Sequence, residues 1–322
     1  RIKGQKIFIT WGEHDMAENI IHLVLARVPD APPGVKGISL FAVPKYLPKG
    51  SGEPGERNDC QAVSLEHKLG IHASPTCVMS FGDNEGAIGY LVGEENRGLA
   101  CMFTMMNNAR LTVGLQGVSI SERAYQQARD YTFERIQGTA PGEQGVSPII
   151  RHPDVRRMLM IMKTLTEAAR GLAYTGCVAV DYAKADNLPD DIKNRYKRRA
   201  DLLTPLVKGW CTEIAQEVTS LGIQCYGGMG FIEETGAAQH YRDARILPIY
   251  EGTNGIQALD LIGRKTVRDR GQAMAELIDD MRPLTGPLQS SSVLTAERQA
   301  RFDQAVAFLE DATRMILERG DD

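Results

Sequence analysis

The residues best suited to chemistry lie in one short segment, IYEGTNGIQALDL, at 249–261. Glu251 stands there between Tyr250 and a Gly-Thr-Asn-Gly turn, and an apolar-patterned helix follows. An acidic residue at the entrance of a helix stabilises it by about 0.3–1 kcal/mol through the helix dipole. A carboxylate that an aromatic neighbour partly desolvates can instead act as a general base. The residue types at this position allow both interpretations.

Two further segments offer arginines to an anionic ligand. Arg110 lies in ARLTVG, in the middle of a predicted helix and among small residues. It could form an ion pair across a helical bundle, or it could contact an anionic ligand. Arg135 and Gln137 lie in FERIQG at the predicted end of the same helix, where a cation interacts favourably with the dipole. On residue types alone, the ion pair and the helix-end position are the simpler interpretations.

The segment IQCYGGMGF at 223–231 is rich in glycine. Its glycine order differs from the dinucleotide-binding pattern GxGxxG, and it follows a helix, whereas that motif follows a strand. A glycine turn that ends the helix is therefore the simplest interpretation. Gln224 and the glycine amides could still contact a ligand, because glycine permits a close approach to the backbone.

The elements that must position these residues change character near residue 98. Short apolar and β-branched segments such as KIFIT and GISLFAV predict strands in the first hundred residues. Apolar residues recur at helical spacing over 98–137, and further helices are predicted from 153, from 191 to 221, and over 269–285 and 295–319. Strands followed by long helices predict an α+β chain whose helical part is a bundle.

The composition is that of an ordinary globular protein, with 43% hydrophobic and 24% charged residues. A net charge of −4 gives no electrostatic basis for binding nucleic acid, and no apolar run is long enough for a membrane span. The six cysteines are scattered without a CxxC pair, which favours reduced thiols in a cytosolic protein, and the histidine spacing predicts no metal site. The chain begins RIKGQKIFIT, without Met and in a strand-like pattern, so we expect it to belong to a larger protein.

Several segments together resemble the acyl-CoA dehydrogenase family. The most characteristic is QCYGGMGFIEETGAAQHYRDARILPIYEGTNGIQ, in which a glycine turn, a YRDAR segment and YEGT follow in the family's order. KIFITWGEHD resembles the flavin-facing strand of the family's middle β domain, and GEENRGL, NNARLTVGLQGV and ERIQG match in type, order and approximate separation. The resemblance covers residues 1–266. Residues 267–322 look like the additional helices of a longer bacterial subgroup that includes 3-methylmercaptopropionyl-CoA dehydrogenases.

The resemblance implies an antiparallel β-barrel-like middle domain at 1–97, a four-helix-bundle domain at 98–266 and a helical extension at 267–322. The chain would start inside the middle domain, and the helical domain that precedes it in the family is missing from this sequence. Because that domain helps to wall the acyl pocket, we expect the chain by itself to bind FAD poorly and to turn over slowly or not at all.

The implied reaction is FAD-dependent α,β-dehydrogenation of an acyl-CoA thioester to the trans-2-enoyl-CoA. Glu251 matches the family's catalytic base, which removes the α proton while the β hydrogen leaves as hydride to flavin N5. The α proton is weakly acidic until the thioester carbonyl is polarised, so the site needs oriented hydrogen-bond donors and little water. The family uses the backbone amide of the base and a ribityl hydroxyl of the flavin as donors.

The same resemblance assigns the other site positions. Tyr250 and Arg110 would lie near the thioester or the CoA, and Ile9 and Thr10 would lie against the isoalloxazine. The remaining FAD contacts would be Arg135 and Gln137 at the phosphate or adenine regions, Thr253 and Asn254 near the phosphates, and Gln224, Gly227 and Gly228 toward the cofactor of a partner subunit.

Two positions depart from the family pattern, since Gly255 stands where Gln is frequent and Phe8 where Trp is frequent.

The resemblance further implies a homodimer or dimer of dimers in the bacterial cytoplasm, an electron-transfer flavoprotein or similar acceptor, and 3-methylmercaptopropionyl-CoA as a candidate substrate. One alternative is an acyl-CoA oxidase that passes electrons to oxygen. Another is a non-catalytic flavin-fold protein acting in binding or assembly, against which the intact motif around Glu251 counts. No strand-GxGxxG-helix unit supports a nicotinamide enzyme.

Overall fold

A computed structural model describes residues 1–284 and 296–320 of the chain. By their contacts these residues form two units, one ending at Asn108 and the other beginning at Ala109. The ends of two predicted helices, residues 285 and 295, lie outside the described residues, as do other positions of the predicted 267–322 extension. The division of the chain into three domains stays a prediction.

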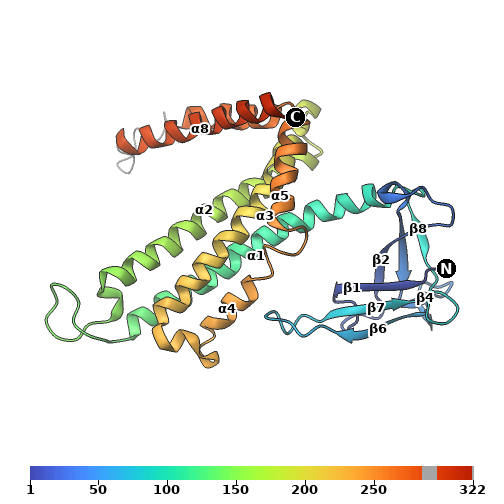
Figure 1. The fold of residues 1–322 in the computed structure, drawn as a ribbon, viewed down its shortest axis with the longest axis horizontal. Coiled ribbons are helices and arrows are strands. Elements are labelled where there is room, and N and C mark those ends of the chain that lie inside the picture. Colours follow the sequence, from blue (N-terminus) through green and yellow to red (C-terminus); the bar gives the residue numbers. More distant parts are fainter. Residues whose placement is uncertain (285–295, 321–322) are drawn as a thin grey trace. The chain divides into compact units, whose positions relative to one another are not determined.

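The first unit is built mainly from short antiparallel strands (Figure 1). Alternating residues explain their burial: in β2 (Ile21–Ala26), His22 and Val24 are buried while Ile21 and Leu23 are exposed. A short 3₁₀ turn, η1 (Gly34–Gly37), separates β2 from β3. The other strands are β1 (Gly4–Thr10), β3 (Ser39–Pro44), β4 (Tyr46–Pro48), β5 (Pro54–Arg57), β6 (Cys60–Leu65), β7 (Thr76–Phe81) and β8 (Tyr90–Val92).

The strand pairing is antiparallel as predicted, but the described strands form open sheets and not one closed barrel. Their orders are β1-β7-β6, β2-β3-β8 and β4-β5. A closed barrel needs continuous pairing around its circumference, and no ladder joins β1 to β2 among these strands. The two larger sheets instead share one apolar core, to which β2 and β3 contribute Val24 and Val43 and β7 contributes Cys77 and Met79.

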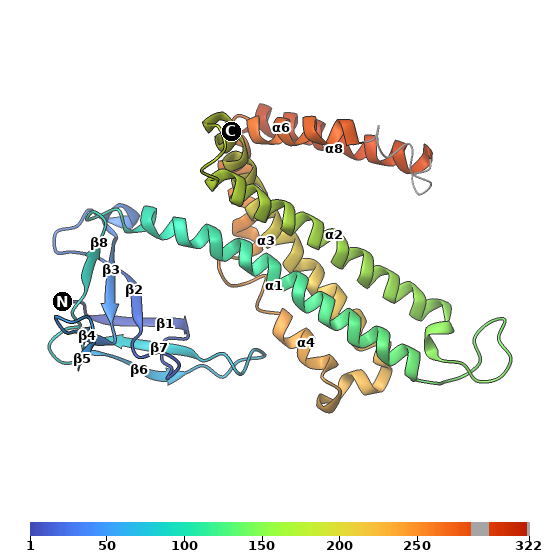
Figure 2. The ribbon, with the colours of Figure 1, turned by 180° about the vertical axis from the view of Figure 1, so that it is seen from behind.

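The second unit is helical. Its part of α1 (Gly98–Glu134) lies beside α2 (Pro153–Lys184) and α3 (Asp190–Tyr226), as Figures 1 and 2 show from opposite sides. Glycines permit the close approach of α1 to α3: a Cβ at Gly114 or Gly117 would come within 2.4 Å of atoms of Val207 or Cys211. The predicted α+β class with a helical bundle is thus confirmed.

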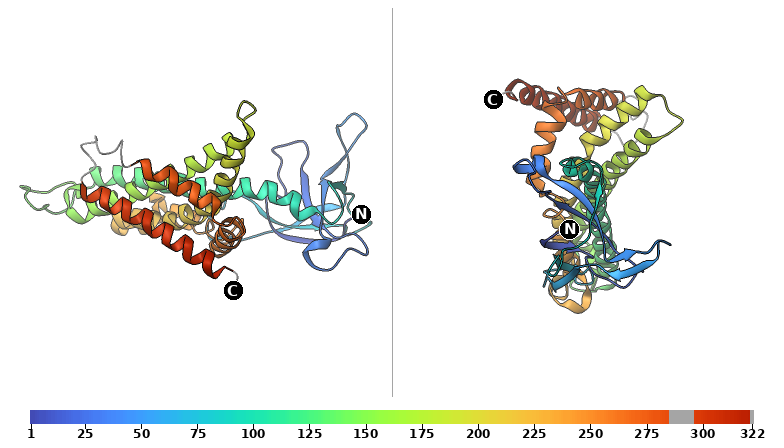
Figure 3. Two further views of the ribbon diagram at one scale, coloured as in Figure 1. Left: turned by 90° about the horizontal axis from the view of Figure 1, so that it is seen from above. Right: turned by 90° about the vertical axis from the view of Figure 1, so that its right-hand side faces the viewer.

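Shorter helices complete this unit. α3 continues past its predicted end at 221 because Cys225 and Tyr226 pack into the bundle, and it ends where Gly227 adopts a φ of 60°. Figure 3 shows the orange and red helices α6 (Gln272–Met281) and α8 (Ala296–Arg319), which share a small core with Leu202 of α3. The remaining elements are η2 (Ile149–Arg151), η3 (Gly227–Phe231), η4 (Glu233–Thr235), α4 (Ala237–Ala244), α5 (Asn254–Leu259), the π-helical η5 (Asp260–Val267), α6 (Gln272–Met281), η6 (Arg282–Leu284) and α8 (Ala296–Arg319).

Candidate functional site

Glu251 lies in the turn between α4 and α5, residues 249–253, which we call the Glu251 turn. Its φ is 55°, and that of Gly252 is 87°. The left-handed conformation costs a non-glycine residue on the order of 1–3 kcal/mol and persists only where the surroundings hold it. The Glu251 side chain is exposed, and its backbone N–H has no hydrogen-bond partner among the described residues. A strained turn therefore presents both a carboxylate and an amide donor.

Contacts with α5 and with the preceding segment hold this backbone. Gln257 is 2% exposed, and its Nε2 donates to the carbonyl oxygen of Gly252 at 3.2 Å and to that of Glu251 at 3.5 Å. The Asn254 amide donates to the carbonyl oxygen of Pro248 at 3.0 Å and closes the loop. A Cβ at Gly252 would stand 2.8 Å from Gln257 Nε2, so the turn has no room for a side chain there.

A buried ion pair lies next to Gly252 of the Glu251 turn. Arg110 Nη1 is 3.2 Å from Asp260 Oδ2, and both side chains are 4% exposed. Arg264 Nε lies 3.2 Å from the other oxygen of Asp260. The second guanidinium nitrogen of Arg110 is 3.7 Å from the position of a Cβ on Gly252. The structure thus shows the ion pair that was one of the two interpretations of Arg110, while a contact with substrate stays a prediction.

Tyr250 is half-buried beside Glu251, and its hydroxyl donates a hydrogen bond to Oε1 of Gln116 on α1. Burial raises the pKa of the Tyr250 phenol, and the negative charge of Glu251 adds to this effect. The phenol is therefore neutral near pH 7. The hydrogen bond to Gln116 fixes the orientation of the ring next to the carboxylate.

A lysine is buried under the same turn. Lys208 on α3 has 0% exposure, and its Nζ lies 2.9 Å from Oδ1 of Asn254. Burial lowers the pKa of this amine to about 8, and the charge of Arg110 acts in the same direction. The carboxylates of Glu213 and Glu251 oppose the shift.

Four residues that support the turn were not predicted from the sequence: Gln116, Lys208, Gln257 and Asp260. Lys208 could have been found, because it falls at helical spacing with Thr204, Cys211 and Ala215, a stripe that is buried in the structure. A lysine within such a stripe is unusual unless it has a polar partner. The roles of the other three could not be predicted from neighbouring residues. Their partners lie on distant segments or are backbone atoms of the turn.

A second group of predicted residues lines a cavity of about 650 Å³ in the helical unit. The rings of Tyr131 and Tyr226 stack there with centroids 4.1 Å apart. The side chain of Arg135 forms no ion pair with any described residue. A Cβ at Gly227 or at Gly228 would meet no atom within 4 Å, so the space beside this backbone is open. The predicted positions that line this cavity are Arg135, Gln137, Gln224, Gly227 and Gly228.

The third group lies in the strand unit. Ile9 and Thr10 line a cavity of about 480 Å³ together with Trp11. The pairing of β1 with β7 shifts between Lys6 and Ile9, which places one extra residue on β1. Such a bulge redirects the side chains that follow it. The departure noted at Phe8 falls within this bulge, where its side chain is 68% exposed.

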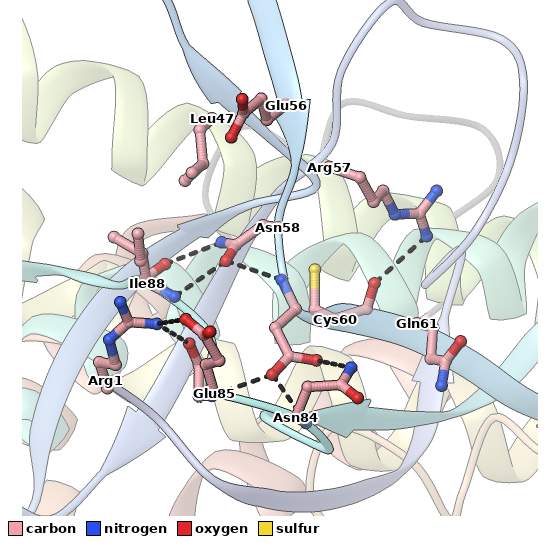
Figure 4. A pocket seen from close by; sticks show the side chains of 12 residues that line it. Arg1, Leu47, Glu56, Arg57, Asn58, Cys60, Gln61, Asn84, Glu85 and Ile88 are labelled. Atoms are coloured by element: carbon pink, nitrogen blue, oxygen red, sulfur yellow. Dashed lines mark hydrogen bonds and ion pairs between the residues drawn. The ribbon is translucent and has the colours of Figure 1, made fainter.

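Another cavity of the strand unit, of about 690 Å³, contains none of the predicted residues (Figure 4). Its polar side chains hold the surrounding loops. Asn58 Nδ2 donates to the carbonyl oxygens of Pro44 and Ile88, and Asn58 Oδ1 accepts from the Ile88 amide, each at 2.9 Å. The Asp59 carboxylate accepts from the amides of Asn84 and Gly86. We therefore assign this cavity a structural role.

Within residues 1–284 and 296–320, no group of three or more His, Cys, Asp or Glu side chains could hold a metal ion. None of the helices in the described part of the chain combines the length and apolar character that crossing a membrane requires.

The predicted site residues thus fall into three places. Glu251, Tyr250, Thr253, Asn254 and Arg110 gather at the Glu251 turn, and none of them lines the cavity at Arg135. The Arg135 group lines its own cavity in the same helical unit, while Ile9 and Thr10 belong to the strand unit.

Comparison with known proteins finds relatives along the whole chain. The profile of the family described as acyl-CoA dehydrogenase, C-terminal domain, matches residues 96–266. The 3-methylmercaptopropionyl-CoA dehydrogenase of Ruegeria pomeroyi is 52% identical over 324 residues, covering 100% of this chain and 54% of that protein. A butyryl-CoA dehydrogenase of Syntrophomonas wolfei is 39% identical, covering 97% of this chain and 51% of that protein.

Solved structures agree with these relatives. The structure of Caenorhabditis elegans ACDH-11 in complex with C11-CoA superposes with a TM-score of 0.77 at 25% identity, covering 94% of this chain and 47% of that one. The chain therefore spans about half the length of the curated relatives it matches.

Proposed function

The chain belongs to the acyl-CoA dehydrogenase family, and on this premise we propose that the protein dehydrogenates an acyl-CoA thioester between its α and β carbons. The observation that carries the proposal is the Glu251 turn. One residue there combines an exposed carboxylate with a backbone N–H that has no partner among the described residues. Removal of a proton next to a carbonyl requires both a base and a hydrogen-bond donor to the carbonyl oxygen.

The cofactor of the proposal is FAD, and the cavity at Arg135 suits part of an anionic dinucleotide. Arg135 has no ion-pair partner among the described residues, so its guanidinium is free to bind a phosphate. The open space beside Gly227 and Gly228 permits a close approach to their backbone. Gln137 and Gln224 add amide groups to the same cavity. In a homodimer, this group would hold the cofactor whose reactive end belongs to the partner subunit.

The other predicted contacts receive unequal support. Thr253 accepts a hydrogen bond from the Ile256 amide at 3.4 Å, which leaves its hydroxyl hydrogen for a phosphate oxygen. Both polar ends of the Asn254 side chain are already bonded to α3, so its bonds do not support a direct contact with FAD. A Cβ at Gly255 would meet nothing closer than Thr253 Oγ1 at 3.9 Å, so the departure at Gly255 leaves open space.

In the proposed mechanism, the thioester carbonyl accepts a hydrogen bond from the Glu251 amide, which increases the acidity of the α carbon. The Glu251 carboxylate takes the α proton. Tyr250, neutral and fixed by Gln116, limits the positions open to the carboxylate. When bound, FAD supplies the acceptor for the hydride that leaves the β carbon. The proposed acceptor of the electrons is an electron-transfer flavoprotein or a similar protein.

We propose 3-methylmercaptopropionyl-CoA as the first substrate to test. The support is the name of the Ruegeria pomeroyi relative, whose identity of 52% extends along the entire chain. Butyryl-CoA is the second substrate to test, because the Syntrophomonas wolfei relative is named a butyryl-CoA dehydrogenase. A series of acyl-CoA thioesters that includes both compounds, assayed with the full-length protein, discriminates between them.

The test compares Glu251→Gln with wild type in the full-length protein. Wild type should purify with bound flavin and reduce an electron acceptor in the presence of acyl-CoA, and Glu251→Gln should lose about 10²–10⁴-fold in kcat. Glu217→Gln, at an exposed position of α3, is the matched control and should keep wild-type turnover. Normal turnover by Glu251→Gln would show that another group is the base.

The two rival functions give different results in the same assay. Hydrogen peroxide formed without an added acceptor would identify an acyl-CoA oxidase. Absence of flavin bleaching by any thioester of the series would favour a non-catalytic flavin-fold protein.

A further inference from the structure

Lys208 is the largest completely buried side chain of the described residues. It lies on α3 with Val207 and Cys211, which belong to the core between the long helices. Lysine is almost never fully buried without a partner, because removing an ammonium group from water is costly. Its place in the fold therefore calls for a specific interaction.

That interaction is with Asn254, which directly follows the Glu251 turn. Lys208 Nζ lies 2.9 Å from Asn254 Oδ1. Asn254 Nδ2 donates to the carbonyl oxygen of Gly209 at 3.2 Å, to Thr212 Oγ1 at 3.0 Å and to Glu213 Oε1 at 2.8 Å. All of these partners lie on a stretch of α3 less than two turns long, so one asparagine side chain fastens the end of the turn to α3.

The backbone of Asn254 is held as well. Its amide donates to the carbonyl oxygen of Pro248 at 3.0 Å, and this bond closes the turn at the residue that is bonded to Lys208. Glu251 lies within the closed loop, in the left-handed conformation. The hydrogen bond between Lys208 and Asn254 therefore helps to hold the backbone conformation of Glu251.

An electrostatic interaction also links Lys208 with Glu251. No carboxylate forms an ion pair with Lys208 in the described part of the chain. The charged groups that face it are Arg110 from α1, Glu213 on α3 and Glu251 from the turn, while Asp260 of η5 is paired with Arg110. The negative charges of Glu213 and Glu251 therefore partly offset the cost of burying the Lys208 ammonium group.

We propose that Lys208 is a positioning residue for Glu251, and that it fixes the turn through its hydrogen bond to Asn254. The inference rests on the proposed function, because it assigns Lys208 a role in the action of Glu251. The residue does not itself contact the reacting atoms.

The test uses two variants of the full-length protein. Lys208→Met removes the positive charge and the hydrogen-bond donor, and Lys208→Arg keeps a positive charge and N–H donors. Lys197→Met is the matched control, since Lys197 is exposed on the same helix. Hydrogen exchange of the backbone amides of Asn254 and Ile256, measured without substrate, reports the anchoring. We expect exchange about tenfold faster in Lys208→Met, as for the loss of one hydrogen bond to a charged group, and wild-type exchange in the control. Asn254→Ala should reproduce the effect, and it serves as the test if Lys208→Met does not fold.

Steady-state kinetics test the consequence for Glu251. In Lys208→Met, kcat per bound flavin should fall about tenfold while KM stays near its wild-type value, and Lys208→Arg should restore kcat. A smaller folded fraction alone would leave kcat per bound flavin unchanged. Wild-type exchange at the turn, or a wild-type kcat in Lys208→Met, would overturn the proposal.

The two readouts separate this inference from the proposed function. If full-length wild-type protein oxidises no acyl-CoA, the proposed function is wrong, and the exchange data decide whether Lys208 anchors the turn. If the enzyme is active but Lys208→Met exchanges like wild type, the role of Lys208 is wrong and the proposed function stands.

Discussion

Arg110 on α1 and Asp260 on η5 are 150 positions apart in the sequence and form a buried ion pair with Nη1 and Oδ2 3.2 Å apart. Such a pair is weak evidence of net stabilisation, because both charges lose their hydration. Removal of one partner destabilises the fold, because the other charge then stays buried without its counter-ion.

The first prediction concerns this pair. Arg110→Met should lower the free energy of unfolding by about 3 kcal/mol. This value is at the lower end of the range for breaking a buried ion pair, because Arg264 still interacts with Asp260 in the variant. Denaturant unfolding of the full-length protein measures the loss. Arg129→Met is the control: its exposed pair with Asp130 should contribute about 1 kcal/mol or less. Equal losses in the two variants would contradict the prediction.

The second prediction compares two glycines of the same segment. Gly252→Ala should lower stability by about 1–2 kcal/mol, because φ is 87° there and the new Cβ would stand 2.8 Å from Gln257 Nε2. Gly255→Ala should be neutral or stabilising by up to about 1 kcal/mol, because the position is helical and has open space. Thermal unfolding of both variants measures the difference. Destabilisation by Gly255→Ala as large as that by Gly252→Ala would show that the left-handed backbone is not the cause.

The third prediction follows from the titration of Lys208. Its pKa is lowered from 10.5 to about 8 by burial and by the charge of Arg110. Between these two pH values the unfolded chain binds more protons than the folded chain, so stability contributed by this group rises with pH. The unfolding free energy of wild type relative to Lys208→Met should therefore increase from pH 8 to pH 10.5 and change little below pH 7. A flat difference over the upper range would mean that the lysine titrates normally.

The fourth prediction concerns the cavity at Arg135. Arg135→Met should weaken FAD binding by about tenfold or more, the equivalent of one charge-assisted hydrogen bond. Flavin retention and a titration of the apoprotein with FAD measure the effect. Arg129→Met, on α1 one residue from its ion-pair partner Asp130, should bind FAD like wild type. Unchanged binding by Arg135→Met would remove this cavity from the cofactor site.

The sequence was sufficient for features that depend on local pattern. Helical spacing indicated the long helices, short apolar and β-branched segments indicated strands in the first hundred residues, and Gly227 and Gly252 fall where φ is positive in the structure. These features are set by nearby residues, through backbone sterics and the periodicity of side chains. The ordered motifs around Glu251 also indicated the family, which the profile match over 96–266 confirms.

The tertiary structure decided how distant residues share a site. It paired Arg110 with Asp260, placed Lys208 under Asn254, and separated the residues around Arg135 from the Glu251 turn. It also arranged the strands as open sheets, in the order β1-β7-β6 for the sheet that carries Ile9 and Thr10. Pairings over such separations depend on which helix faces and strand edges pack together, and a local pattern contains no information about them. For Glu251 the sequence identified a carboxylate at a turn, and only packing showed what holds that turn in a strained conformation.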